Sequence, residues 1–519
     1  MTRSSYARLD ATLDALPSRY SGPGGAVAVL KDGNVLAKRA WGWADAAQRL
    51  PFTDKTPFLV CSITKQFTCA LLLDLFPDPS VLDADLRQFM PKLEGPFPTV
   101  RELCHNQSGL RDYWALAMLC GPPVEGYFGP DEARRLIGGT RSLHFAPGTR
   151  YSYVNQNFRL VADLIAARTG QDYATLLRSR ILERAGMPDA ALNPDTSAVR
   201  DGTVGYEGTA QGGFFPAVNR IVWTGDAGLA ASLEDMIAWE RFIDATRDDA
   251  DGLYRRLSAP QTFRGGAPAA YGFGLRRDRM LGREITGHGG GLRGWRSMRL
   301  YAPAERVSVV VLFNHMADAH AAAEEVFGAA LDLPPSPSAT PGDAAAWAGR
   351  FIDPESGLAT RLEPLANGKL ALHFARAPEA LTADGAGAWS GSTSRITRDA
   401  DGVRMERPSE NINTRLLPVE AASRIDIEGA WHCDELGATF TVTLAGGVPY
   451  AAFSGDLGDG EMLALVPFAQ DVWLMPCPRA LDYAAPGDWT VIFQRDSGGR
   501  IGSVQLGCWL ARKVVYRAV

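Results

Sequence analysis

Features that would indicate several other classes of protein are missing from this sequence of 519 residues. No run of lysine or arginine occurs, and a formal net charge of −6 with a pI near 5.8 argues against nucleic acid as a partner. No apolar stretch reaches the roughly 20 residues of a membrane-spanning helix, so we expect no membrane segment. His-Glu-x-x-His and Cys-x-x-Cys are absent as well, so we expect neither a metal nor another cofactor.

Cysteine is scarce and its pattern is irregular. The seven cysteines, an odd number, are scattered without the spacing of a metal site, which is usual in a reducing compartment. The first ten residues lack the apolar core of a signal peptide. We therefore expect a cytoplasmic protein, unless a leader has been removed from a longer form.

Lysine is equally scarce, and one lysine stands in a distinctive motif. Of seven lysines, only Lys65 has a serine three residues before it, in Ser62-Ile63-Thr64-Lys65. An extended segment, 57–60, precedes the motif, and an apolar stretch, 67–76, predicts a buried helix after it. Ser62 would then lie at a helix N-terminus, where unpaired N–H groups and the helix dipole favour an alkoxide and an oxyanion.

The spacing of this motif gives it a chemical meaning. Residues i and i+3 share a helix face, so the Lys65 amine can reach the Ser62 hydroxyl. It can take the hydroxyl proton if burial and neighbouring charge lower the lysine pKa. The alternative is a serine N-cap followed by a solvated lysine. A catalytic thiol at Cys61 is a further alternative, but a buried structural cysteine is the expected reading.

Two later segments supply further polar groups. Tyr153 and Asn155 follow a turn at Pro147-Gly148, so both can face one cleft from a loop, the first as a proton shuttle and the second as an amide for the substrate. The segment 284–288 predicts a strand that ends at His288, and the glycines after it permit close approach of a substrate backbone to an edge strand. The alternatives are a tyrosine packed in a core and a histidine in a surface turn.

The glycines after His288 also satisfy G-x-G-x-x-G, the dinucleotide-binding fingerprint, at Gly289, Gly291 and Gly294. That fingerprint must open a helix. Here the segments 295–300 and 307–313 read as two strands, so the context rejects a nucleotide site.

On these motifs the chain resembles the serine β-lactamase and penicillin-binding-protein superfamily, in its class C-like branch, and within that branch the bacterial D-stereospecific aminopeptidases. The resemblance covers about residues 20–330, and further landmarks occur in the family's order at 103–110, 228–236 and 271–275. It implies an α+β fold, in which an antiparallel sheet is flanked by helices and a mostly helical insertion. We expect one hairpin of this sheet to turn at Asp32-Gly33.

Carried over by position, the resemblance implies that Ser62 is the nucleophile and that Lys65 and Tyr153 exchange the proton. Asn155 would hold a substrate amide. Gly291 would complete an oxyanion hole by adding its backbone N–H to that of the nucleophile.

The same resemblance places His288 where the family usually has the lysine of Lys-Thr-Gly, with Gly290 and Gly291 beside the substrate. An enzyme that binds a substrate carboxylate is well served by a permanent cation, and a neutral imidazole serves that task poorly. An aminopeptidase instead needs a carboxylate for the α-ammonium group of its substrate. Esterases of the superfamily can also carry histidine here, so that alternative stays open.

The chain exceeds one ordinary domain, and its composition changes beyond residue 331. A proline-rich linker at 332–342 separates a catalytic domain, 1–331, from short alternating segments and turn pairs typical of small antiparallel β-barrels. We expect one barrel at 343–418 and a second at 424–519. By the resemblance, a loop of the second barrel, 476–488, is directed to the active site.

Within that loop, Asp482 would supply negative charge near the substrate amine; the alternative is an ordinary exposed hairpin tip. The resemblance thus implies a serine aminopeptidase that removes amino-terminal D-residues of the D-Ala, Gly or D-Ser type from small peptides and amides. The alternatives are an esterase, a D-alanyl-D-alanine carboxypeptidase or β-lactamase, and a penicillin-binding sensor without turnover. A homodimer is possible.

Overall fold

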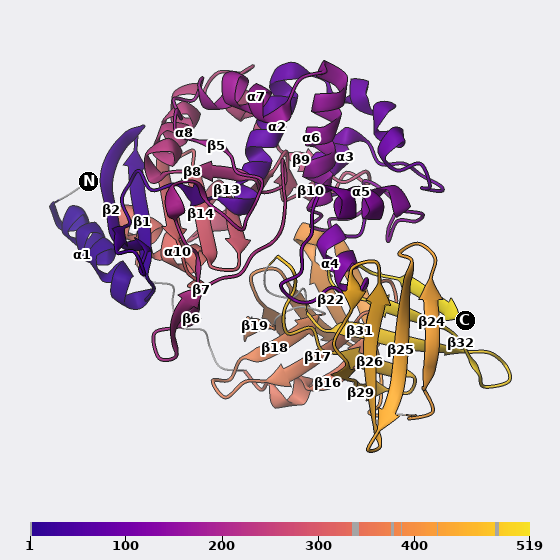
Figure 1. Ribbon diagram of the computed structural model, residues 1–519. Coiled ribbons are helices and arrows are strands. Elements are labelled where there is room, and N and C mark those ends of the chain that lie inside the picture. Colours follow the sequence, from indigo (N-terminus) through magenta and orange to yellow (C-terminus); the bar gives the residue numbers. More distant parts are fainter. Residues whose placement is uncertain (1–2, 335–341, 375–377, 386, 423, 483–486) are drawn as a thin grey trace.

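The computed structural model describes residues 3–334, 342–374, 378–385, 387–422, 424–482 and 487–519. A part rich in helices extends to about residue 332, and two β structures lie together on one side of it (Figure 1). Most of the predicted linker, residues 335–341, and residues 483–486 of the predicted loop lie outside the described residues. The predicted division into domains stays a prediction.

An antiparallel sheet of eight strands forms the centre of the first part. In spatial order its strands are β11 (Tyr271–Gly272), β12 (Leu275–Met280), β13 (Arg283–Leu292), β14 (Trp295–Ala302), β15 (Val307–Phe313), β1 (Gly24–Lys31), β2 (Asn34–Asp45) and β3 (Leu50–Pro51). The predicted hairpin through Asp32-Gly33 joins β1 to β2. The fold is α+β, as predicted.

Helices cover both faces of this sheet (Figure 1). α1 (Arg3–Arg19) and α10 (Ala319–Ala330) pack on one face, and α8 (Leu233–Thr246) packs on the other. The remaining helices of this part are α2 (Thr64–Leu75), α3 (Val100–Cys104), α4 (Tyr113–Met118), α5 (Pro130–Gly139), α6 (Gln156–Thr169), α7 (Tyr173–Leu177) and α9 (Leu253–Leu257). Among the described residues, no helix combines the length and the apolar character that crossing a membrane requires.

The sequence of β1 explains why both faces are covered. Side chains alternate between the faces of a strand. Val27 and Val29 join the core formed with α1 and α10, whereas Ala26, Ala28 and Leu30 join the larger core on the other face. A strand buried on both sides reads as a continuous apolar run, which is what this segment shows.

Short strands form small separate sheets in the same part of the molecule. They are β4 (Phe58–Leu59), β8 (Leu229–Ala231) and β5 (Ala191–Leu192) in one small sheet, with the pairs β6 (Tyr206–Thr209) and β7 (Gly213–Pro216), and β9 (Gln261–Thr262) and β10 (Pro268–Ala269). The first of these sheets matters most for function, because β4 leads directly into the turn that carries Ser62.

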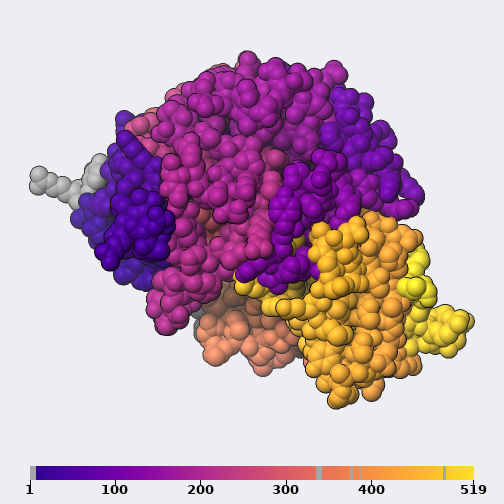
Figure 2. Space-filling model, in the orientation of Figure 1, coloured from indigo at the N-terminus to yellow at the C-terminus, as the bar shows by residue number. Residues whose placement is uncertain are grey.

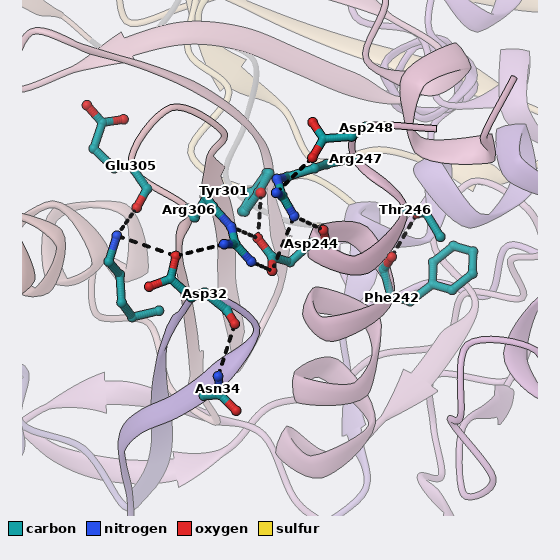
Figure 3. Close-up of polar contacts among 11 residues, drawn as sticks. Asp32, Asn34, Phe242, Asp244, Thr246, Arg247, Asp248, Tyr301, Glu305 and Arg306 are labelled. Carbon is teal, nitrogen blue, oxygen red and sulfur yellow. Dashed lines mark hydrogen bonds and ion pairs between the residues drawn. The ribbon is translucent and has the colours of Figure 1, made fainter. Parts of the chain in front are cut away.

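A polar cluster ties α8 to two turns of the sheet (Figure 3). The Asp244 carboxylate accepts hydrogen bonds from the Tyr301 hydroxyl at 2.8 Å and from Arg306 Nη2 at 2.6 Å. Arg306, in the turn between β14 and β15, also pairs at 3.1 Å with Asp32, in the turn between β1 and β2. The cluster thus joins a helix to the ends of two hairpins.

A second charged pair lies deeper, between α8 and β14. Arg299 Nε and Nη2 each donate to a carboxylate oxygen of Glu240 at 2.6 Å, and both side chains are fully buried. Ser308 also donates to this carboxylate, at 2.7 Å. This pair is one turn of α8 away from Asp244.

The first β structure is a closed barrel of eight strands, as predicted. Its strands are β16 (Gly349–Ile352), β17 (Ala359–Pro364), β18 (Leu370–Phe374), β19 (Glu379–Ala383), β20 (Ala388–Ser390), β21 (Arg395–Asp399), β22 (Gly402–Arg407) and β23 (Ile412–Pro418). Each of these strands pairs with a neighbour on both sides, which closes the barrel.

The second β structure is an open, curled sheet, a half-barrel. Its strands are β24 (Gly429–Cys433), β25 (Ala438–Ala445), β26 (Val448–Gly455), β27 (Gly458–Asp459), β28 (Leu463–Ala464), β29 (Val466–Ala469), β30 (Val472–Met475), β31 (Trp489–Arg495), β32 (Ile501–Gly507) and β33 (Val514–Ala518). The predicted loop 476–488 connects β30 to β31.

The half-barrel packs directly against the helical part, and Figure 2 shows the two in continuous contact on one face of the molecule. The buried guanidinium of Arg111 donates to the carbonyl of Arg512 at 2.7 Å. Beside it, the Asp112 backbone N–H donates to the Leu510 carbonyl at 3.0 Å. These contacts bring the C-terminal part close to the residues of the site described next.

Candidate active site

Ser62 lies in a tight turn at the beginning of the buried helix. The turn is a single 3₁₀ turn, Cys61–Ile63, after which α2 starts at Thr64. Cys61 has φ 52°, a left-handed conformation that costs a residue other than glycine about 1 kcal/mol. Strain of this kind is concentrated at functional sites, because only the surrounding structure can maintain it.

Strand β13 presses against this turn through a glycine. A Cβ atom added to Gly290 would lie 2.2 Å from the Val60 carbonyl oxygen and 3.1 Å from the Cys61 Cβ, so no side chain fits there. Glycine allows this close approach of two backbones. The segment of His288 and its following glycines is thereby held beside Ser62, the predicted nucleophile.

The Lys65 side chain is fully buried under Ser62. Its Nζ atom donates hydrogen bonds to three neutral oxygens: Ser62 Oγ at 3.0 Å, Asn155 Oδ1 at 2.9 Å and the Asp226 carbonyl at 2.7 Å. Burial lowers the pKa of Lys65 to about 8, and nearby carboxylates, that of Asp226 foremost, oppose the shift. The neighbouring charge therefore acts against the direction predicted from the sequence, because it is negative.

Asn155 is engaged at both ends of its amide. Oδ1 accepts from Lys65, while Nδ2 and the backbone N–H donate to one carboxylate oxygen of buried Asp112 at 2.8 and 2.7 Å. Burial raises the pKa of Asp112, and the hydrogen bonds from Asn155 oppose this rise. The geometry favours a role for Asn155 in orienting Lys65, and its contact with a substrate amide stays a prediction.

Tyr153 completes a triangle with the serine and the lysine. Its ring centre lies 4.9 Å from Lys65 Nζ. Burial raises the pKa of the Tyr153 phenol well above its usual value, and a hydrogen bond with Ser62 acts in the opposite direction. The phenol therefore keeps its proton at neutral pH.

His288 faces Tyr153 from β13, with 6.1 Å between the ring centres. Its Nδ1 lies 2.5 Å from the Gly289 carbonyl oxygen and donates to it, which leaves Nε2 to accept from the Tyr271 hydroxyl at 3.0 Å. Burial, assisted by the charge of Lys65, lowers the pKa of His288 to about 3. The imidazole is neutral at pH 7.

The strand that carries His288 does not end where the sequence predicts. β13 continues through the glycines to Leu292, because Gly289 to Leu292 pair with β14. On its other side β12 pairs only as far as Gly287, so in the described part of the chain the segment after it has one strand partner. Gly290 and Gly291 thus lie on an open strand edge beside Ser62.

The loop of the half-barrel reaches the same region. The carbonyls of Leu481 and Asp482 accept hydrogen bonds from Arg293, which follows β13 directly. The Asp482 carboxylate is one of the charges that oppose the lowered pKa of Lys65, so it lies within electrostatic range of that amine. Its predicted contact with a substrate amine stays a prediction.

Sequence reasoning missed four residues of this site: Asp112, Asp226, Tyr271 and Arg293. Tyr271 begins the landmark segment 271–275, and Asp112 lies two residues after the landmark segment 103–110. The sequence therefore holds a local signal for both residues. The partners of Asp226 and Arg293 are set by tertiary contacts and carry no local signal. Together with the predicted residues they form one cluster, which we call the Ser62 site.

The Ser62 site has the parts that acyl transfer requires. It offers a hydroxyl, an amine whose lowered pKa lets it act as a base near neutral pH, and a phenol that contacts both. It also offers an open strand edge for a substrate backbone.

Comparison with known proteins agrees with this geometry. The family model described as Beta-lactamase matches residues 9–332, and the model described as D-aminopeptidase, domain B matches residues 341–517. A D-aminopeptidase of Gluconobacter oxydans (strain 621H) is 53% identical over 528 aligned residues, which cover 100% of both chains. A D-aminopeptidase of Brucella canis is 47% identical over 98% of each chain.

Solved structures with lower identity share the fold. An octameric penicillin-binding protein homologue from Pyrococcus abyssi has a TM-score of 0.54 at 20% identity, covering 79% of this chain and 99% of its own. A D-amino acid amidase from Ochrobactrum anthropi SV3, in complex with D-phenylalanine, has a TM-score of 0.53 at 21% identity, covering 63% and 99%.

Proposed function

The chain belongs to the Beta-lactamase family and carries the D-aminopeptidase domain B, and we propose that Ser62 is its nucleophile. It is a D-stereospecific aminopeptidase or amidase of the β-lactamase superfamily, a hydrolase whose substrates are D-amino-acid amides or peptides. The observation that carries the proposal is the 3.0 Å contact between Lys65 Nζ and Ser62 Oγ at a fully buried lysine.

In the proposed acylation step, Ser62 Oγ attacks the carbonyl carbon of the amino-terminal D-residue. The neutral amine of Lys65 accepts the hydroxyl proton. As the amide bond breaks, Tyr153 passes its own proton to the nitrogen of the leaving amine and takes up the proton that Lys65 holds. The D-residue remains as an ester on Ser62. Water then attacks this ester and gives up a proton to Lys65. Ser62 Oγ regains a proton through Lys65 and Tyr153, and the free D-amino acid is released.

The oxyanion of both tetrahedral intermediates needs hydrogen-bond donors that are already in position. We assign this role to the backbone N–H groups of Ser62 and Gly291. The close packing of Gly290 against the Cys61 turn supports the assignment, because it fixes the distance between the two chain segments that carry these donors.

The neutral state of His288 supports an aminopeptidase over an enzyme that binds a substrate carboxylate. An imidazole with a pKa near 3 carries no charge at pH 7, and its Nε2 already accepts a hydrogen bond from Tyr271. It offers no cation to a C-terminal carboxylate. The Asp482 carboxylate, in contrast, suits the α-ammonium group of a substrate.

A kinetic comparison tests these roles. Ser62→Ala should abolish hydrolysis of D-alanine p-nitroanilide, and Asp482→Ala should lower kcat/KM for it about tenfold or more. If Asp482→Ala stays within twofold of the unaltered protein while Ser62→Ala is inactive, the role of Asp482 is wrong.

Two further substrates separate this reading from its alternatives. Faster turnover of p-nitrophenyl acetate than of the anilide would favour an esterase. A single burst of acylation by a penicillin, without turnover of either substrate, would favour a sensor. Multiple turnovers of the anilide are the result expected here.

Location and assembly belong to the same proposal. We infer a cytoplasmic homodimer that acts on small peptides and amides, and the seven cysteines, which are unpaired in the structure, support a reducing compartment. Sedimentation of the purified protein at several concentrations tests the assembly, and fractionation of its host tests the location.

A further inference from the structure

Arg293 occupies a particular place beside the Ser62 site. It lies in the two-residue turn between β13 and β14, two residues beyond Gly291. Only 3% of the residue is exposed, although arginine is rarely buried without a charged partner. Its guanidinium is therefore held by something specific.

The contacts of Arg293 join three segments of the chain. Nη2 donates to the Leu481 carbonyl at 2.5 Å, and the backbone N–H donates to the Asp482 carbonyl at 3.2 Å. Nη1 and Nη2 also donate to the Val124 carbonyl, at 3.2 and 3.3 Å. One residue thus connects the end of β13, the helical part and the loop of the half-barrel.

The chemistry of these contacts favours a positioning role. The planar guanidinium donates along fixed directions, so it can hold two carbonyls in a defined relation, which an ammonium on a flexible stem cannot do. Its acceptors are neutral carbonyls, and burial lowers the pKa of Arg293. Burying a charge in this way is costly, and better stability would be obtained from an apolar residue.

A surface ion pair between the helical part and the half-barrel contrasts with the buried contacts of Arg293. Arg135, on α5, pairs with Asp456 of the half-barrel at 3.0 Å, and the two side chains are 33% and 59% exposed. Such a pair is screened by solvent and fixes geometry weakly. It joins the same two parts away from the Ser62 site.

We propose that Arg293 is the positioning residue that holds Asp482 toward the Ser62 site and thereby sets the preference for substrates with a free amino terminus. This inference rests on the proposed function of Asp482 as the partner of the substrate ammonium group. Arg293 touches neither the reacting atoms nor the substrate. Its loss should therefore change which substrates are accepted more than it changes the chemistry itself.

The test measures a ratio of two substrates in the full-length protein. It compares kcat/KM for D-alanine p-nitroanilide with kcat/KM for N-acetyl-D-alanine p-nitroanilide, which lacks the ammonium group. Arg293→Met should lower this ratio about tenfold or more. Arg135→Met, the matched control, should leave it within twofold.

A double variant shows whether Arg293 acts through Asp482. In the Asp482→Ala background, the further change Arg293→Met should leave the ratio within twofold, because the group that it positions is already gone. An additional tenfold loss in that background would overturn the inference.

The outcomes distinguish this inference from the function on which it rests. If Asp482→Ala lowers the ratio and Arg293→Met does not, Arg293 has no positioning role, and the role of Asp482 stands. If neither variant changes the ratio while Ser62→Ala is inactive, both roles are wrong.

If Arg293→Met does not fold, Arg293→Lys decides the question. This variant keeps the positive charge but loses the planar guanidinium with its fixed donor directions. A lower ratio therefore supports the inference, and an unchanged ratio overturns it.

Discussion

Two buried cations on the same face of the sheet illustrate two uses of charge in this protein. Arg299 is fully buried and bonds both oxygens of Glu240 at 2.6 Å. Lys65 is equally buried, yet its three hydrogen bonds go to neutral oxygens. The first cation has its charge matched, and the second does not.

The difference separates a structural charge from a chemical one. A buried ion that is paired keeps its charge and fixes the elements around it, while a buried amine without a bonded carboxylate shifts its pKa and becomes able to exchange a proton. Burial of Lys65 costs stability, but it also lowers the pKa of the amine to about 8, so that the amine can act as a base. The exposed ion pairs of the surface form a third group, which has little effect on stability or on reactivity.

Lys65→Met should produce the largest effect. It removes the base, so kcat/KM for D-alanine p-nitroanilide should fall about 10,000-fold, roughly 5 kcal/mol in activation free energy. The same change removes a buried amine, so the melting temperature should stay the same or rise.

A variant that melts well below the unaltered protein, with activity lost only in proportion to unfolding, would show that Lys65 is structural. Lys65→Arg is the informative second variant. It restores a cation without a usable base, so it should be as inactive as the methionine variant.

Arg299→Met should reverse this pattern. It leaves the Glu240 carboxylate buried and unpaired, which should lower the free energy of unfolding by about 3 to 5 kcal/mol in a denaturant titration. The fraction that remains folded should keep kcat/KM within a fewfold. Arg299 is the cross-strand neighbour of His288, but its side-chain hydrogen bonds go to Glu240 and to the Thr286 carbonyl. Unchanged stability of Arg299→Met would show that Arg299 is not a structural charge, and the contrast with Lys65 would be wrong.

The pH dependence of stability should carry the signature of Lys65. Its pKa is near 8 in the folded protein against a usual 10.5, so between these values the unfolded chain binds the proton and the folded one does not. Stability should therefore rise as pH increases from 8 to 10.5, by about 3 kcal/mol from this group.

The rise is to be measured as the difference between the unaltered protein and Lys65→Met, since tyrosines titrate in the same range. The value of kcat/KM should also increase with pH through about 8, because the neutral amine is the active form. A pH-independent difference between the two proteins would mean that the lysine pKa is not lowered.

Arg134→Ala should produce the smallest effect. Arg134 pairs with Asp131 at 2.6 Å on α5, and the two side chains are 76% and 87% exposed. Exposed pairs contribute at most about 0.5 kcal/mol on a helix, so both stability and kcat/KM should be nearly unchanged. A loss above about 1 kcal/mol would show that exposure does not separate these classes of charge.

Local signals in the sequence were sufficient for most of the fold. The turn at Asp32-Gly33 and the apolar run before it predict the β1–β2 hairpin, since turn chemistry and strand pattern agree there. The buried helix after Ser62 and the barrel strands follow from the same kind of agreement.

The sequence failed where tertiary pairing overrides a local signal. Glycines predict the end of a strand, yet Gly289 to Leu292 continue β13, because β14 supplies their hydrogen bonds. The left-handed conformation of Cys61 is likewise imposed by its surroundings.

For the site, the motifs predicted the residues and missed the contacts between them. Ser62 and Lys65 share a helix, so their contact could be predicted from spacing. The bonds from Asn155 to Asp112 span 43 residues, and those of Arg293 to the half-barrel span 188. No local pattern encodes contacts at such separations.

Trapping the acyl-enzyme tests the central claim most directly. The protein is mixed with D-alanine p-nitroanilide, quenched in acid within the steady state, digested and analysed by mass spectrometry. We predict the added mass of one alanyl group on the peptide that contains Ser62, located at Ser62 by fragmentation and absent in Ser62→Ala. An alanyl group on Cys61 or any other residue, or turnover by Ser62→Ala, would contradict the account.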